Sequence, residues 1–312
     1  MIISPPYTDI YNLVTIPPDF SILDHLGGFD ANLTNPMLDH LSKISQQNTV
    51  TSTYIFDEQV KKYYSNINFK VSQTQLNLFQ KLSNYNIHPE LDYKNFICSF
   101  NGSGHVSRKL LVSILEKFKY YNPEYCSKNF SYSADILDGH INDYVPDQIN
   151  LYRKFFISAD SEDFFQTVNS FGHVRFEHNK NIYNLENKLT ESFLHIVSES
   201  LATTYYPFLS EKPFYSIVTR GLFLTYAQPG WHAHIEKYLG FKLYTNLFDY
   251  KFDLIQNPVE RLVELMTMVG KFSKLTPLEW HDLYLLEQDN IEFNYDHYFS
   301  RNYLKVLKEF DE

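Results

Sequence analysis

Hydrophobic positions along the chain follow two different periods, and beyond residue 90 these periods alternate. The run 95–100 is short and apolar, and the loop 101–105 contains two glycines. From Val106 onward, apolar residues recur at the three- and four-residue spacing of a helix. This succession predicts a strand, a loop and a helix. Earlier in the chain the pattern is irregular, and the segment 73–84 has the spacing of a helix.

The alternation of apolar runs and amphipathic segments becomes regular in the second half of the chain. The predicted strands there span 193–197, 221–226 and 241–245, and the predicted helices start near Ser210 and span 231–239. Strands that alternate with helices are typical of a parallel sheet covered by helices. We therefore predict an α/β protein with two halves, at 95–170 and 193–275, arranged as two Rossmann-like domains that face a cleft.

Two later helices carry signals for their first residues. Asn257 and Thr276 each precede a proline and stand three residues before a glutamate, which is the pattern of a helix cap followed by proline at the first helical position. We expect a helix to start after each of these residues. A last amphipathic helix is predicted at about 295–310.

Composition places the chain among ordinary globular proteins. Its 312 residues are 44% hydrophobic and 21% charged, which is unlike disordered chains and is enough for two modest domains. No apolar run reaches about 18 residues, and the N-terminus lacks the basic start of a signal peptide. The two cysteines, Cys98 and Cys126, cannot form a disulfide framework. These features predict a cytoplasmic protein without a membrane span.

The charge and the aromatic content narrow the classes of partner. A formal charge of −10 argues against a broad nucleic-acid-binding surface, because such surfaces are basic, although it leaves room for a local basic cleft. Aromatic residues make up 17% of the chain. We attribute this excess first to the codon bias of an A+T-rich viral or bacterial genome, in which case the host cytoplasm is the expected location of a viral protein.

Ligands of doubly wound sheets bind beyond the carboxyl ends of the strands, so residues just after each strand are candidate site residues. This rule selects the segments 101–108, 160–163, 198–212 and 227–234. In the third segment, Glu199 follows a strand directly and is a candidate acceptor for the hydroxyls of a sugar or ribose.

A helix start follows in the same segment. Ser210 is a candidate cap, and Glu211 and Lys212 then occupy the first helical turn, where free amides and a lysine favour a diphosphate. The alternative is that Glu211 only complements the helix dipole and that Lys212 is a solvated lysine.

An ordered set of motifs surrounds these residues. It comprises Val197-Ser198-Glu199-Ser200, Phe208-Leu209-Ser210-Glu211-Lys212, Gly221 before the strand L-F-L-T-Y, Pro229-Gly230, the stretch 239–242, the acidic segment 248–253 and Arg261. This set resembles the donor-binding signature of α1,3-fucosyltransferases and, more closely, glycosyltransferase-like proteins of bacteriophages and giant viruses. The resemblance covers about 190–275. It departs from the family pattern at Ser210, which replaces a threonine, and at Pro213.

The resemblance implies a GT-B architecture, an inverting and metal-independent transfer, and a nucleoside-diphosphate sugar as co-substrate. The implied acceptor is a hydroxyl of a glycan or of a modified DNA base. The implied domains are an N-terminal acceptor-side domain at 1–180, a donor-binding domain at 181–290 and a C-terminal helix at 291–312. Glu199 and Glu211 would contact the donor sugar or ribose and Lys212 the diphosphate, with Ser210 and Gly221 completing the donor-binding set.

The loop 101–105 and the helix after it form a second candidate region. Its glycines would let the backbone approach a ligand closely, and Arg108 in the first helical turn could reach a phosphate or an acceptor carboxylate. His105 is the candidate general base that removes the proton of the acceptor hydroxyl. The alternative is a tight turn with an exposed histidine.

The sequence also contains two clusters of possible metal ligands. The acidic run 160–163, with Asp160 and Glu162, follows an apolar run and could hold Mg²⁺ or Mn²⁺, as in a metal-dependent GT-A enzyme, but it is also typical of an acid-rich helix start. His232 and His234 are two residues apart, which points them to different sides of a helix and disfavours zinc. We therefore predict no metal and keep the GT-A enzyme as an alternative.

Functions of other classes remain open from the sequence. One is a non-catalytic protein that binds a nucleotide or a carbohydrate and has lost turnover. Another is a structural protein of a virion, which the aromatic excess suggests. Hydrolysis of donor sugars would separate an enzyme from both.

Overall fold

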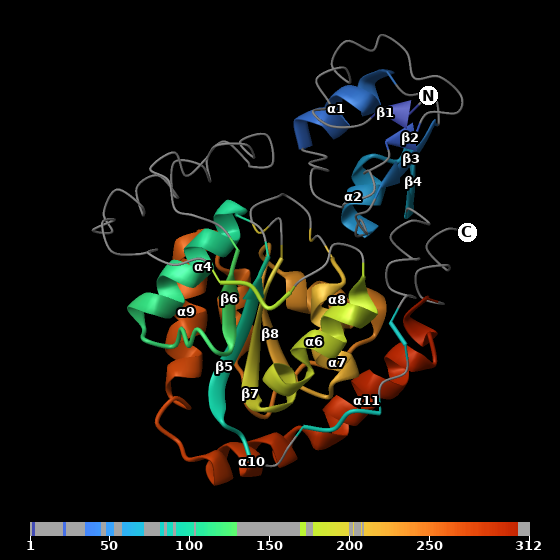
Figure 1. Cartoon of the computed structure of the whole chain (residues 1–312). Helices are drawn as coiled ribbons and strands as arrows, with labels where there is room; N and C mark the ends of the chain where they lie inside the picture. Colours follow the sequence, from blue (N-terminus) through green and yellow to red (C-terminus); the bar gives the residue numbers. More distant parts are fainter. Residues whose placement is uncertain are drawn as a thin grey trace.

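Most of the chain beyond residue 91 and several shorter segments before it are described by a computed structural model (Figure 1). The described residues are 2–3, 21–22, 35–44, 48–52, 58–71, 82–83, 86–89, 92–102, 104–129, 169–172, 177–199, 202, 207 and 209–304. The helix expected at 73–84 falls almost entirely outside these residues, as does the acidic run 160–163.

A parallel four-stranded sheet forms the centre of the structure. Its strands are β5 (Asn95–Asn101), β6 (Cys126–Lys128), β7 (Ser192–Ser198) and β8 (Leu222–Tyr226), in the order β6-β5-β7-β8. Three of these strands match the predictions at 95–100, 193–197 and 221–226. They are apolar runs because a parallel sheet with helices on both faces buries both sides of its strands.

The prediction of two separate α/β halves was wrong for these strands. β5 pairs with β7, with Ile97 opposite Leu194, so strands from both predicted halves belong to one sheet. The boundary expected at 180 separates strands that are joined by hydrogen bonds. Hydrophobic periodicity identifies a buried strand, but it carries no information about which other strand lies beside it.

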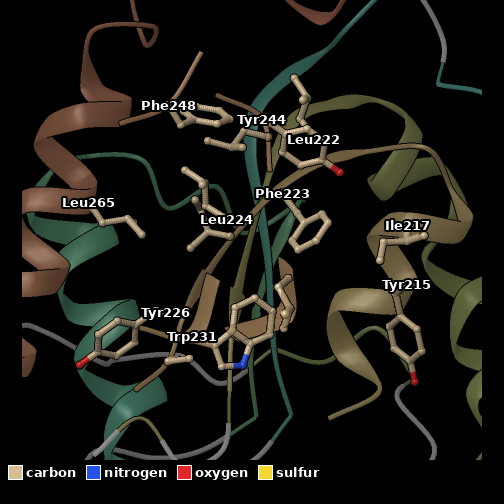
Figure 2. Close-up of a cluster of buried hydrophobic side chains, with 14 of the residues drawn as sticks. Tyr215, Ile217, Leu222, Phe223, Leu224, Tyr226, Trp231, Tyr244, Phe248 and Leu265 are labelled. Carbon is tan, nitrogen blue, oxygen red and sulfur yellow. The ribbon is translucent and has the colours of Figure 1, made fainter. Parts of the chain in front are cut away.

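Helices cover both faces of the sheet (Figure 1). On one face lie α4 (Val106–Lys117) and α9 (Pro258–Gly270), and on the other lie α6 (His178–Thr190), α7 (Lys212–Val218) and α8 (Trp231–Leu239). The predicted helix at 231–239 is confirmed. β8 shows how the sheet is buried: Leu224 points toward Leu265 of α9, and Phe223 points toward Ile217 of α7 (Figure 2).

Two helices, α10 (Pro277–Leu286) and α11 (Gln288–Phe299), follow α9. Near the start of the sheet, Trp280 of α10 stacks on Phe193, with ring centroids 5.8 Å apart. The predicted helix starts at α9 and α10 are confirmed. Asn257 accepts hydrogen bonds from the amides of Val259 and Glu260, and Thr276 forms a capping box with Glu279.

The end of the chain differs from its prediction. α11 starts at Gln288 rather than near 295, and residues 305–310 of the predicted helix 295–310 lie outside the described part. The strand predicted at 241–245 is wrong, because this segment has no regular structure through Tyr244 and then turns. Asn294 of α11 takes the place of a neighbouring strand: it accepts a hydrogen bond from the amide of Lys242 at 2.7 Å and donates one to its carbonyl at 2.9 Å.

The N-terminal part of the chain forms its own group of elements (Figure 1). It contains β1 (Ile2–Ile3), β2 (Ser21–Ile22), α1 (Asn35–Ile44), β3 (Asn48–Ser52), α2 (Glu58–Tyr63) and β4 (Ile67–Val71). β1 pairs with β2 and β3 pairs with β4, both in parallel. The sequence pattern did not resolve these elements. In the described part of the chain, no helix is both long and apolar enough to cross a membrane.

Candidate functional site

The strand order reverses between β5 and β7, which makes the carboxyl ends of these two strands the expected ligand site. The chain passes from β5 to β6 on one side and from β7 to β8 on the other. α4 follows β5 on one face of the sheet and α7 follows β7 on the opposite face (Figure 1). In open parallel sheets, such a reversal leaves a crevice beyond the strand ends, where ligands bind. The two candidate segments 101–108 and 198–212 therefore meet at one edge.

Glu199 links the strand ends to both helices at this edge. Its amide donates to the carbonyl of Tyr226 at 3.0 Å, and its carbonyl accepts from the hydroxyl of Ser107 at 3.2 Å. Its Oε1 accepts from the amide of Ser210 at 2.9 Å, whereas its Oε2 is buried and has no hydrogen-bond partner among the described residues. Burial raises the pKa of the Glu199 carboxyl, against the opposing effects of Lys212 and of the hydrogen bond from Ser210.

Two of the amides that the sequence suggested would be open at the start of α7 already have partners. The helix starts at Lys212, two residues after Ser210, and it is seven residues long. The amide of Ser210 is bonded to Glu199, and the amide of Lys212 donates to the Ser210 hydroxyl at 3.3 Å. Ser210 is not the cap of α7, because Glu211 stands at that position, but its hydroxyl also accepts from Nζ of Lys212 at 3.0 Å. Fewer amides are therefore available to an anion here than the sequence suggested, and the charged side chains gain importance.

Glu211 and Lys212 form a partly buried ion pair. Oε1 of Glu211 lies 3.5 Å from Nζ of Lys212, and their side chains are 18% and 15% exposed. Burial by itself raises the pKa of the Glu211 carboxyl, but the charge of Lys212, followed by those of His178 and Arg108, outweighs burial and holds this pKa at about 2. The alternative in which Lys212 is a solvated lysine is wrong. Burial lowers the pKa of its ammonium group, and Arg108 lowers it further against the charges of Glu211 and Glu199.

Arg108 belongs to the same electrostatic cluster, although it comes from the other predicted half. It lies in the first turn of α4, is buried, and acts on both Glu211 and Lys212. His105 precedes α4, and its carbonyl accepts from the amides of Arg108 and Lys109, both at 3.0 Å. His105 is buried, so the alternative of an exposed histidine in the turn is wrong. Its role as a general base stays a prediction.

His178 is a residue of this cluster that sequence reasoning missed. It is the first residue of α6, and its Nδ1 lies 2.7 Å from the hydroxyl of Tyr215. Tyr215 stands one turn after Glu211 in α7, and His178 acts electrostatically on Glu211. No local pattern marks His178, because its partners are distant in sequence and meet it only in the folded chain.

Gly221 does not lie at this edge. It precedes β8 and therefore stands at the amino end of the strand, away from the crevice. A side chain at this position would overlap the imidazole of His195 in β7, which explains why glycine is required. His195 is itself satisfied within the protein, since Nδ1 lies 2.9 Å from the Ser216 hydroxyl and Nε2 lies 2.7 Å from the Leu189 carbonyl. Burial lowers its pKa to about 4.

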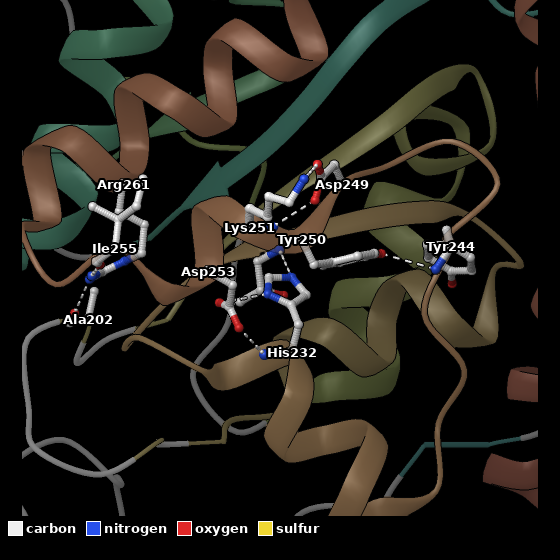
Figure 3. A network of polar contacts seen from close by, with 10 residues as sticks. Ala202, His232, Tyr244, Asp249, Tyr250, Lys251, Asp253, Ile255 and Arg261 are labelled. Carbon is white, nitrogen blue, oxygen red and sulfur yellow. Dashed lines mark hydrogen bonds and ion pairs between the residues drawn. The ribbon is translucent and has the colours of Figure 1, made fainter.

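His232 has a structural role that leaves no ring nitrogen for a metal (Figure 3). Its Nδ1 is 2.9 Å from Oδ1 of Asp253, whose Oδ2 accepts from the amide of His232 at 2.9 Å. Its Nε2 accepts from the amide of Thr225 in β8 at 3.1 Å. In the described ranges of the chain, no group of three His, Cys, Asp or Glu side chains could hold a metal ion. Asp160 and Glu162 lie outside those ranges.

Arg261 holds the backbone that follows Glu199 (Figure 3). It is buried in the first part of α9, and it donates to the carbonyls of Ile255 and Ala202, the latter at 2.9 Å. Ala202 lies three residues after Glu199, so Arg261 links α9 to the connection between β7 and α7. Arg261 is therefore a positioning residue for the candidate site.

Comparisons with known proteins do not assign the chain to a family. No family model matches the sequence, and no curated protein matches it. The functional conclusion therefore depends on the residues at the carboxyl edge of the sheet.

Proposed function

We propose that the protein is a glycosyltransferase that transfers a sugar from a nucleoside-diphosphate sugar to a hydroxyl acceptor, a glycan or a modified nucleobase. The donor would bind at the reversal of strand order between β5 and β7. One observation carries the proposal: at this edge Nζ of Lys212 lies 3.5 Å from the carboxylate of Glu211, and Arg108 and His178, which come from two other helices, act electrostatically on the same carboxylate.

The chemistry of the cluster suits the leaving group of such a reaction. Displacement at the anomeric carbon releases a nucleoside diphosphate, and the charge that develops on this group must be neutralised. Arg108 and Lys212 supply that neutralisation from side chains of the protein, so the proposed reaction is independent of a metal. Removal of the proton from the acceptor hydroxyl is assigned to His105, which lies in the connection between β5 and α4.

The GT-B arrangement is the proposed architecture behind this activity. The four-stranded sheet and its helices would form the donor-binding domain. The N-terminal group of β1 to β4 with α1 and α2 would contribute the acceptor side. The parallel pairs β1-β2 and β3-β4 are separate from the four-stranded sheet, which is in keeping with this arrangement, and the resemblance in the segment 190–275 supports its donor-binding half.

A thermal-unfolding panel tests the donor site without knowledge of the acceptor. The panel contains UDP, GDP, ADP and CDP and sugars carried by each. We expect one nucleotide class to raise the melting temperature, because a ligand present at 100 times its Kd stabilises the native state by about 2.7 kcal/mol. The stabilising donor sugar is then incubated with the protein, and released nucleoside diphosphate is measured with and without candidate acceptors.

The outcomes separate the rival functions. Stabilisation together with release of the diphosphate supports the glycosyltransferase. Stabilisation by a nucleotide without turnover of any donor favours a binding protein and contradicts the enzyme. If no nucleotide changes the melting temperature, a donor site at the edge of β5 and β7 is excluded.

A further inference from the structure

The cations at the carboxyl edge already hold an anion that belongs to the chain. Oε1 of Glu211 is 3.5 Å from Nζ of Lys212, and Arg108 and His178 also act on this carboxylate. The second carboxylate nearby, that of Glu199, is bonded to the amide of Ser210, and burial raises its pKa, whereas the pKa of Glu211 is held at about 2. Glu211 is therefore the negatively charged partner that the cluster holds in the absence of ligand.

A phosphate ligand would meet a competitor at this place. A phosphate group needs the same cationic side chains that now surround Glu211, because charge-assisted hydrogen bonds from Lys and Arg are its main contacts in proteins. A carboxylate and a phosphate that both lie beside the ammonium group of Lys212 would repel each other. The side chain of Glu211 is 18% exposed, so part of it already reaches solvent.

We propose that Glu211 is a built-in competitor of the phosphate ligand, and that its carboxylate occupies the position beside Nζ of Lys212 that the ligand's diphosphate takes on binding. This inference rests on the proposed function, whose donor carries a diphosphate. It differs from the role that the family resemblance implies for Glu211, which is a contact to the donor sugar or ribose. When the diphosphate product leaves, Glu211 returns to the cations, which weakens product binding and favours release.

The test uses inorganic pyrophosphate as the probe, because it presents the diphosphate without a sugar or base. Binding is measured by isothermal titration calorimetry on the full chain and on Glu211→Gln. We expect Glu211→Gln to bind pyrophosphate about tenfold more tightly, which corresponds to about 1.4 kcal/mol. Glu264→Gln is the matched control, since it removes the same charge from an exposed position on α9 and should leave the affinity unchanged.

A second pair of variants isolates the competition from a general charge effect. In a Lys212→Met background the pair is already broken, so Glu211→Gln should improve pyrophosphate binding by less than about threefold, well short of the tenfold gain at 1.4 kcal/mol. Glu211→Asp keeps the charge but shortens the side chain. It should bind pyrophosphate more tightly than the unaltered chain and less tightly than Glu211→Gln. This variant also provides a result if Glu211→Gln does not fold.

Three results would overturn the proposal. They are weaker pyrophosphate binding by both Glu211 variants, a gain no larger than that of Glu264→Gln, and no detectable binding by any variant. The assay of sugar transfer from the unaltered chain is read separately. Tighter pyrophosphate binding without sugar transfer would reject the glycosyltransferase and retain the competitor, whereas sugar transfer without tighter binding would do the reverse.

Discussion

Two regions of the molecule bury polar side chains, and they satisfy these side chains in different ways. Beneath α8, both ring nitrogens of His232 and both carboxylate oxygens of Asp253 have partners within the protein. At the carboxyl edge, Oε2 of Glu199 is buried without a partner among the described residues, and a lysine and a glutamate with shifted pKa values share a partly exposed ion pair.

This difference separates a structural network from a binding site. A buried network in which every group is paired contributes to stability and leaves nothing for a ligand to contact. Groups that stay unpaired or strongly perturbed at a strand edge are candidates for function, because the fold retains them at a cost in stability. Changes in the first region should therefore alter unfolding, and changes in the second should alter binding.

The largest expected effect is on how the free energy of unfolding depends on pH, and it comes from His195. This histidine resembles His232 in that both of its ring nitrogens have partners within the protein. Its pKa of about 4 in the folded chain is below the ordinary value of 6.5, so the unfolded chain binds more protons between these values. The contribution of His195 to the free energy of unfolding is therefore fully present above pH 6.5. It decreases as the pH falls toward 4, by about 3 kcal/mol in total. Urea unfolding between pH 7.5 and 4.5 measures this loss.

His195→Gln is the control for this pH effect. It should be less stable at pH 7.5 but should lack most of the decrease contributed by His195. A decrease of equal size in His195→Gln would show that another group causes it.

Asp253→Ala tests the paired network directly. We expect a loss of about 3 kcal/mol in the free energy of unfolding, because the amide and the ring of His232 both lose their buried acceptor. Chemical denaturation measures it, and Asp249→Ala is the comparison, since Asp249 is an exposed cap nearby. An equal effect of the two substitutions would contradict the distinction between buried and exposed acceptors.

Lys212→Ala tests the binding region. We expect nucleoside-diphosphate affinity to fall by roughly 10- to 100-fold, as expected for loss of a charge-assisted hydrogen bond, while the chain still folds but loses some stability because Glu211 loses its ion-pair partner. Titration of the nucleotide that stabilises the unaltered chain provides the measurement. Lys274→Ala removes a lysine from an exposed position and should bind normally. Unaltered nucleotide affinity in Lys212→Ala would remove Lys212 from the site.

Glu199→Gln should have the smallest effect on unfolding. The amide oxygen of the glutamine can still accept the hydrogen bond from Ser210, and burial already favours the neutral form of Glu199, so we expect a change below about 1 kcal/mol. Thermal and urea unfolding at pH 7 measure it. A loss of unfolding free energy comparable to that of Asp253→Ala would show that Glu199 stabilises the fold in the way that the His232–Asp253 network does.

Elements with local signals were predicted well from the sequence. The strands at 193–197 and 221–226 are apolar runs, and the caps Asn257 and Thr276 act on amides two or three residues away. The segment 241–245 has the same apolar character as a strand but was predicted wrongly. The amide and the carbonyl of Lys242 in this segment are hydrogen-bonded to Asn294, about fifty residues later, and no local pattern carries that information.

The candidate site was predicted in part for the same reason. Glu199, Ser210 and Lys212 are close in sequence and were identified together, and in the structure Ser210 is hydrogen-bonded to both of the others. Their role in donor binding stays a prediction. Arg108 was placed in a different half, His178 was not recognised, and Gly221 was assigned to the site although it stands at the other end of its strand. The positions of Arg108 and His178 depend on how distant elements pack, which periodicity does not encode, whereas the place of Gly221 before its strand is already visible in the sequence.

The sequence by itself determined the local chemistry of this protein: which runs form strands, where helices begin, and that a lysine and two glutamates follow the strand β7. The tertiary structure alone decided that β5 lies beside β7, which brings Arg108 and His178 to those residues. The physical reason is the distance along the sequence over which each interaction acts. Caps and periodicity act over a few residues, whereas the electrostatic cluster exists only after the sheet has joined segments about one hundred residues apart.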